Sequence, residues 1–170
     1  MGPVSASIVI DRSREDVFDF LVDLANRESF CDHFISGLRL ERLESSGVGA
    51  AARLRVERRS NGIWMETVIT EAERPHLIQE RGHGGRLDRI PMFTAWELVS
   101  EPVDATELRL TFWTEPSQLV DRMRDHPGAT RWWRRRWARA LRRLRDLLES
   151  GADVEPVRVA GADRVPVVGR

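Results

Sequence analysis

The stretch Gly128–Ser150, GATRWWRRRWARALRRLRDLLES, decides how the rest of the chain must fold. On an α-helix its large apolar side chains fall within a stripe about 120° wide, and that stripe contains no arginine. The stripe consists of Trp133, Trp137, Ala140, Leu141, Leu144, Leu147 and Leu148. Such a helix would be about 34 Å long and would need a large apolar partner. The preceding residues must supply that surface.

The composition favours one domain with a true core. A chain of 170 residues, 41% of them hydrophobic, is typical of a single globular domain. No apolar run approaches the roughly 18 residues of a membrane span, and the N-terminus lacks the pattern of a secretory signal. We therefore expect a soluble, cytoplasmic protein. The single cysteine, Cys31, excludes an intrachain disulfide.

Charge is balanced overall but unevenly distributed. The 27 basic residues are all arginine, and they equal the acidic residues in number. The stretch 128–150 carries eight arginines against Asp146 and Glu149, so the remainder of the chain is acidic. The sequence predicts a basic outer helix face on an acidic body, with arginine stems shielding the edges of the apolar stripe.

The residues before this helix predict one strand, short helices and then a run of strands. Ser13 is a good N-cap for a short helix, and the segment Asn26–Phe34 continues as a second short helix or turn. From Leu38 onward the apolar period becomes two, and Asn61-Gly62 is a strong hairpin signal. The predicted strands are Val4–Ile10, Leu38–Leu43, Ala52–Val56, Ile63–Glu71, His76–Arg81, Met92–Val99 and Glu107–Thr114. Ser117–Asp125 is predicted to be helical, and residues 151–170 a disordered tail.

The predicted order is therefore β-α-α-β6-α, an α+β arrangement. Strands joined by short turns favour an antiparallel meander over a parallel sheet. Such a sheet has one apolar face to cover, and the C-terminal helix is the large apolar cover available. A curved sheet around a single helix leaves room for a cavity between them.

Several local patterns, taken in order, resemble the START-like or SRPBCC superfamily, which includes Bet v 1-like and polyketide cyclase/dehydrase-like proteins. The likeness is carried by the opening SIVIDRSREDVFDFLVD (Ser7–Asp23) and by ITEAERP (Ile69–Pro75). The DAT turn (Asp104–Thr106) and the terminal ALRRLRDLLE (Ala140–Glu149) also fit. The resemblance covers residues 1–150 and implies a helix-grip fold, with a curved antiparallel sheet wrapped around the long C-terminal helix.

The resemblance also implies an internal cavity that binds a hydrophobic small molecule, lipid-like or polyketide-like. Strand phase and the helix stripe then select the wall of that cavity, and the competing interpretation is that the same residues simply form a packed core. The predicted ligand-binding residues are Phe30, Phe34, Leu54, Val56, Met65, Thr67, Ile69, Thr94, Trp96, Leu98, Leu110, Phe112, Trp133, Trp137 and Leu141.

Two polar residues are candidates for catalysis in such a cavity. Glu71 shares the predicted inward phase of its strand, and a buried carboxylate can act as a general base. The alternative for Glu71 is a salt bridge to Arg58 across the hairpin. His83 lies in a glycine-rich turn, where it could contact a ligand. Related aromatase/cyclases carry aromatic residues and an arginine along the strand of Glu71, and this chain does not, which argues against aromatisation.

Three functions remain open at this stage. The first is binding of a hydrophobic small molecule, and the second is a polyketide cyclase or dehydratase reaction in the same cavity. The third is a partner-binding module that uses the arginine-rich helix face, where Trp132 lies about 60° outside the apolar stripe. The histidine spacing predicts no metal site, and no cofactor, nucleic acid or integral membrane association is expected.

Overall fold

The computed structural model describes residues 1–57, 62–85, 88–101, 104–116, 127–151, 157–159 and 162–164. Its elements follow the predicted order of a strand, short helices, a run of strands and a long helix. The helical elements are α1 (Arg14–Leu21), the 3-10 turn η1 (Leu24–Asn26), α2 (Arg27–Cys31) and α4 (Pro127–Ser150). The strands are β1 (Val4–Ile10), β2 (Ile35–Leu40), β3 (Ala51–Val56), β4 (Ile63–Glu73), β5 (Leu77–Gly84), β6 (Ile90–Glu101), β7 (Ala105–Thr114), β8 (Val157–Val159) and β9 (Ala162–Arg164).

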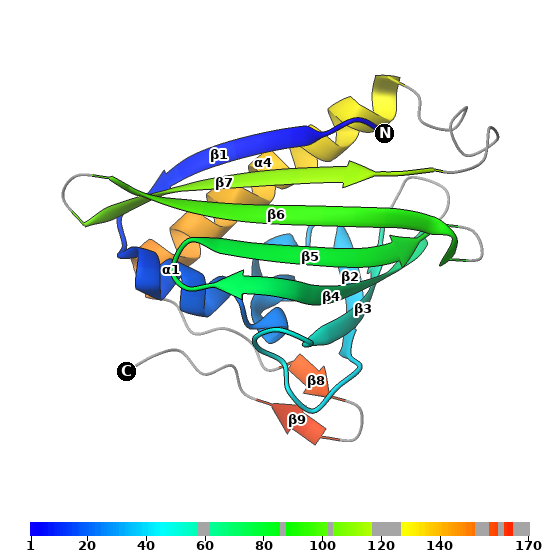
Figure 1. The fold of residues 1–170 in the computed structure, drawn as a ribbon, viewed down its shortest axis with the longest axis horizontal. Helices are drawn as coiled ribbons and strands as arrows, with labels where there is room; N and C mark the ends of the chain where they lie inside the picture. The colour runs from blue at the N-terminus through cyan, green and yellow to red at the C-terminus, as the bar shows by residue number, and fades with distance from the viewer. Residues whose placement is uncertain are drawn as a thin grey trace.

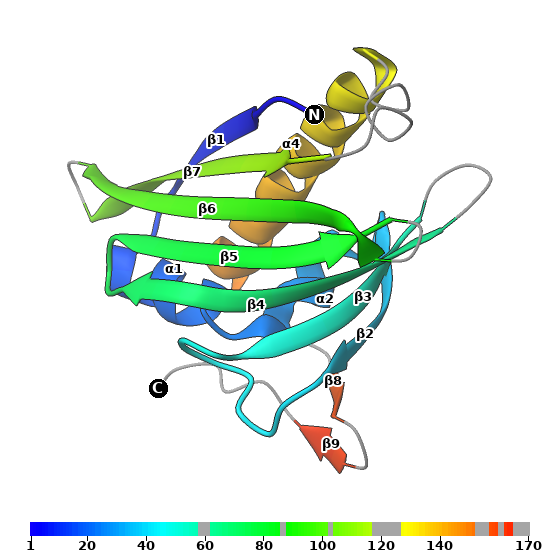
Figure 2. The same cartoon turned by 45° about the vertical axis from the view of Figure 1, so that its right-hand side comes forward.

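The described strands form one sheet in the order β1-β7-β6-β5-β4-β3-β2-β8-β9. Strands β2 to β7 follow one another as an antiparallel meander, and β1 pairs with β7 from Val4 opposite Phe112 to Ile10 opposite Thr106. The sheet is strongly curved, and α4 lies on its concave side (Figure 1, Figure 2). The predicted α+β helix-grip fold is confirmed.

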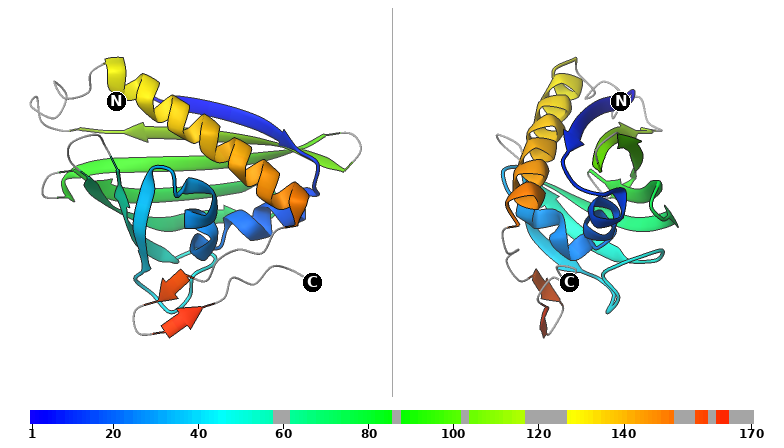
Figure 3. Two further views of the ribbon diagram at one scale, coloured as in Figure 1. Left: turned by 180° about the vertical axis from the view of Figure 1, so that it is seen from behind. Right: turned by 90° about the vertical axis from the view of Figure 1, so that its left-hand side faces the viewer.

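Helix α4 buries the apolar stripe that the sequence predicts. Trp133, Trp137, Ala140, Leu141 and Leu144 are all at most 6% exposed. The helix runs diagonally across the concave side, next to β1 (Figure 3). Its outer face exposes several arginines: Arg131, Arg134, Arg135, Arg139 and Arg142. The helix ends at Ser150, and Gly151 follows it with a φ of 66°, which suits a residue without a side chain.

A bulge in β4 changes which residues face the interior. Ile69 lies opposite Glu80 of β5, whereas Glu71 lies opposite Gln79, so β4 has one extra residue between these pairs. Side chains of a strand alternate between the faces of a sheet, and an extra residue reverses that alternation. Beyond the bulge it is Ala72, opposite the buried Ile78, that shares the inner face.

After α4 the described residues include the short strands β8 and β9. Leu40 of β2 pairs with Val159, and β8 pairs with β9 in turn. At these residues the structure differs from the predicted disordered tail; the rest of residues 152–170 lies outside the described part of the chain. The segment predicted to be helical, 117–125, also lies outside it, as do Arg58 and Asn61.

Candidate functional site

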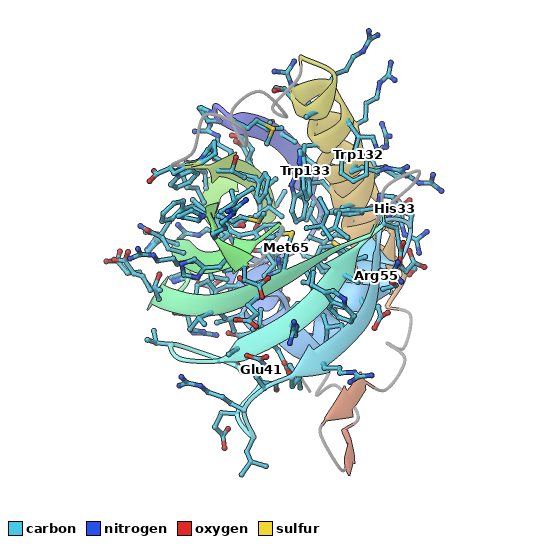
Figure 4. The ribbon with its side chains drawn as sticks, turned by 90° about the vertical axis from the view of Figure 1, so that its right-hand side faces the viewer. His33, Glu41, Arg55, Met65, Trp132 and Trp133 are labelled. Carbon is cyan, nitrogen blue, oxygen red and sulfur yellow. The ribbon has the colours of Figure 1, made fainter. Side chains whose placement is uncertain are left out.

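An aromatic cluster occupies the space between α4 and the sheet. The ring of Phe34 lies edge-on to Trp137 with centroids 5.3 Å apart, and Phe112 of β7 lies 4.5 Å from Trp133. Trp96 of β6 meets Trp137 edge-on at 5.8 Å. Figure 4 shows Trp133 and Met65 on the inside, between the helix and the curved sheet. These rings present both edges and faces, which are the contacts that flat apolar molecules use.

A charged pair lies within this apolar interior. Arg27 of α2 and Glu80 of β5 are each 4% exposed, and Arg27 Nη2 donates to Glu80 Oε1 at 2.5 Å. Trp96 Nε1 donates to the same oxygen at 2.7 Å, and Thr67 Oγ1 donates to Oε2 at 3.1 Å. The Arg27 guanidinium also lies 4.8 Å from the Trp96 ring. We call Arg27, Thr67, Glu80 and Trp96 the polar cluster.

The polar cluster is poorly explained as a device for stability. Removing a carboxylate and a guanidinium from water costs several kcal/mol for each ion, and their attraction only offsets that cost when the geometry is good. An apolar pair of the same volume is often as stable or more stable. We therefore take the polar cluster as the candidate functional site.

The inner face of the sheet carries small residues beside Glu80. The strand register places Ala52, Thr67 and Gly82 side by side on β3, β4 and β5. Gly82 is buried and faces the interior with Glu80, two residues earlier on the same strand. Because these residues have short side chains or none, little side-chain volume covers the backbone of the sheet along this row.

His33 connects α4 to the loop after α2. Its Nε2 lies 3.2 Å from the carbonyl oxygen of Arg136, and its Nδ1 is buried without a hydrogen-bond partner in the described residues. Burial lowers the pKa of His33, and the charges of Arg139, Arg143 and Arg136 lower it further, against the hydrogen bond to the Arg136 carbonyl. The folded protein therefore favours the neutral imidazole.

This lowered pKa predicts a loss of stability in mild acid. A histidine in the unfolded chain takes up a proton at about pH 6.5, whereas folded His33 resists protonation. The neutral His33 side chain therefore contributes to the stability of the fold above that pH, and this contribution is lost below it. Besides the three arginines, Asp32 faces the ring, with its Oδ1 4.0 Å from Nδ1. We expect His33→Gln to flatten the decrease in the urea unfolding midpoint between about pH 7 and about pH 5. His76→Gln is the matched control, since His76 is exposed; an unchanged decrease in His33→Gln would contradict the assignment.

The structure brings the predicted ligand-binding residues to one interior. All fifteen are buried except Thr67, which is half-buried. Their shared location follows from strand phase and from the helix stripe, as the sequence predicts. Whether they bind a ligand stays a prediction. Trp132, placed outside the stripe by its angle, is half-buried and meets Phe34 edge-on at 6.2 Å.

Neither predicted catalytic candidate faces the interior. The placement of Glu71 on the inner face is wrong, because the β4 bulge turns this side chain to the other face, opposite Gln79. His83 is exposed and lies between the buried glycines Gly82 and Gly84, so it too points away from the interior.

The sequence prediction missed Arg27 and Glu80. The segment Leu77–Gly84 alternates, and its buried residues Ile78, Glu80, Gly82 and Gly84 share one phase. That phase would have identified Glu80 as an inward carboxylate. For Arg27 the available signal was its position three residues before Phe30, on the same face of α2.

Other chemistries find little support among the described residues. Burial raises the pKa of the Cys31 thiol far above its ordinary value, so this cysteine is a poor nucleophile. The described residues contain no group of three or more histidine, cysteine, aspartate or glutamate side chains arranged to hold a metal ion. Within the same residues, no helix has the length and apolar character needed to cross a membrane.

Comparison with known proteins extends these observations. The family model for polyketide cyclase / dehydrase and lipid transport proteins matches residues 1–149. TTHA0849 from Thermus thermophilus has a similar structure, with a TM-score of 0.68 and 14% identity over 89% of this chain and 99% of that one. A START superfamily protein from Mycobacterium smegmatis gives a TM-score of 0.66 and 15% identity over 88% and 99%.

DynU16, a protein in the dynemicin biosynthetic locus, gives a TM-score of 0.61 and 15% identity, covering 88% of this chain and 48% of that one. Identities this low establish a shared fold and nothing further. A search of curated proteins gave no match.

Proposed function

Since the chain belongs to the START-like family of polyketide cyclase/dehydrase and lipid transport proteins, we propose that it binds a hydrophobic small molecule between the sheet and α4. The observation that supports this most is the polar cluster inside an apolar, aromatic interior. Binding sites for small molecules are typically apolar, with a few polar groups that fix the orientation of the ligand.

The aromatic rings and the polar cluster contact different parts of the ligand. The rings of Trp96, Trp133, Trp137 and Phe112 supply apolar area and edge or face contacts for the body of the ligand. The polar cluster supplies a hydrogen-bonding end, because Glu80 can accept from a hydroxyl group and Arg27 can donate to an oxygen. The ligand class is therefore an apolar molecule that carries at least one oxygen.

Calorimetric titration with palmitate, a flavonoid and a hydroxylated anthraquinone tests this proposal. We expect saturable 1:1 binding of at least one of them. The double variant Arg27→Met with Glu80→Leu should weaken that binding at least tenfold, because the polar end of the ligand loses its partners. Arg135→Ala, on the outer face of α4, is the control and should bind as the wild type does. Absence of saturable binding for every probe would refute the proposal.

A cyclase or dehydratase reaction in the same interior is the second candidate, and Glu80 is the observation that favours it. This buried carboxylate lies beside apolar walls, where a carboxylate can move protons. Its oxygens accept hydrogen bonds from Arg27, Trp96 and Thr67, so its role in such a reaction would be that of an acceptor. If Glu80→Gln turned over a poly-β-ketone probe as fast as the wild type, Glu80 would have no part in such a reaction.

A further inference from the structure

Two indoles lie next to each other in the interior and differ in one respect. Trp96 donates its Nε1–H to Glu80 at 2.7 Å. Trp137, whose ring centroid is 5.8 Å away, is 4% exposed, and its Nε1 has no hydrogen-bond partner in the described residues. A buried donor without a partner costs free energy, and indole N–H groups in protein interiors usually find an acceptor.

The surroundings of Trp137 provide no strong acceptor in the described part of the chain. Its ring contacts are Phe34 at 5.3 Å, Phe112 at 5.9 Å and Trp133 at 6.3 Å, besides Trp96. An aromatic face accepts a hydrogen bond only weakly. The N–H is thus a donor held in a fixed position among rings, since Trp137 is anchored on α4 and packed on several sides.

We propose that Trp137 Nε1–H donates a hydrogen bond to a carbonyl oxygen on the bound molecule, and so selects flat, carbonyl-bearing ring compounds over hydrocarbons. The inference rests on the proposed binding function and specifies its ligand class. The rings around Trp137 suit a flat ligand body. The polar cluster, which includes the neighbouring Trp96, provides a second polar contact. A ligand with oxygens at two positions can therefore bind both the Trp137 N–H and the polar cluster.

The expected selectivity follows from hydrogen-bond energetics. A ligand that lacks an acceptor leaves the N–H unpaired in the complex, whereas a ketone pairs it. Sites built around a buried donor discriminate against analogues that lack the matching acceptor more strongly than apolar pockets discriminate by size. We expect a preference of about tenfold or more for the ketone.

A matched pair of ligands isolates this hydrogen bond. The probes are 2-acetylnaphthalene and 2-ethylnaphthalene, which have the same ring system and nearly the same size but differ in the carbonyl. The wild type should bind the ketone about tenfold more tightly. Trp137→Phe keeps an aromatic ring and removes the N–H, so it should abolish the preference by weakening ketone binding more than hydrocarbon binding. Trp64→Phe, which alters an exposed indole of β4, is the control and should retain the preference.

A spectroscopic readout follows the N–H itself. In a ¹⁵N-labelled wild-type protein, the indole signal of Trp137, assigned as the one missing from Trp137→Phe, should move downfield with the ketone and not with the hydrocarbon. If Trp137→Phe does not fold, the wild-type comparison of the two probes, with the indole signals followed during titration, decides. Equal affinities for the two probes, or a preference that survives in Trp137→Phe, would overturn the inference and leave the binding function intact. Binding of neither these probes nor those above would overturn both.

Discussion

Replacing Glu80 with leucine is expected to destabilise the protein by about 3–5 kcal/mol, because Arg27 is then left as a buried charge without its partner. The N–H of Trp96 and the hydroxyl of Thr67 lose their acceptor at the same time. Urea unfolding followed by circular dichroism measures this loss. The expected magnitude is a large share of the total stability of a domain of this size.

Two further variants separate the buried charge from the loss of the side chain. Adding Arg27→Met to Glu80→Leu should restore most of the stability, because an apolar pair replaces the ionic one. Glu66→Leu on neighbouring β4 is the matched control: its carboxylate is 3.9 Å from Arg53, and both side chains are about 40% exposed, so we expect a change below about 1 kcal/mol. Wild-type stability of Glu80→Leu alone would show that the ionic pair does not exist as described.

Gly82→Ala is expected to destabilise the protein by about 3 kcal/mol or more. A Cβ at this position would overlap the carbonyl oxygen of Glu66, which belongs to the backbone of β4 and cannot turn away as a flexible side chain does. The β4–β5 pairing, which carries both Thr67 and Glu80, would have to shift. Thermal unfolding monitors this change, and ligand binding should weaken with it.

Gly128→Ala provides the contrast. Among the described residues, no atom outside its immediate chain neighbours and the backbone of its own helix lies within 4 Å of a Cβ built at Gly128, which is in the first turn of α4. Alanine is a better helix former than glycine by up to about 1 kcal/mol, so this variant should be as stable as the wild type or more stable. Equal melting temperatures for Gly82→Ala and Gly128→Ala would refute the close approach at Gly82.

Periodicity predicted most of the fold because it reports which side of an element is buried. The α4 stripe and the inward phases of β3, β6 and β7 follow directly from it. The phase of β4 failed beyond Ile69, because a bulge depends on the partner strand and leaves no mark in the alternation of one strand. Glu71 was misplaced for that reason.

The centre of the candidate site was harder to predict for a different reason. Arg27 and Glu80 are charged, and charged residues are almost always on the surface unless they pair. Arg27 and Glu80 are far apart in the sequence, so they pair only when α2 has docked on the sheet. The aromatic walls were predictable as apolar side chains, whereas the unpaired N–H of Trp137 required the packed neighbours to be known.

The pairing of β1 with β7 has a consequence for the order in which the chain can fold as it leaves the ribosome. Val4 is synthesised well before Phe112, its partner in the sheet, and α4, which covers the inner face, follows later still. Until α4 is made, the nascent sheet exposes an uncovered apolar face, a feature that invites aggregation. Contacts between distant parts of a chain also slow folding. Chaperones that hold unfinished β-sheets during synthesis should therefore raise the yield of folded protein more than a lower temperature after synthesis would.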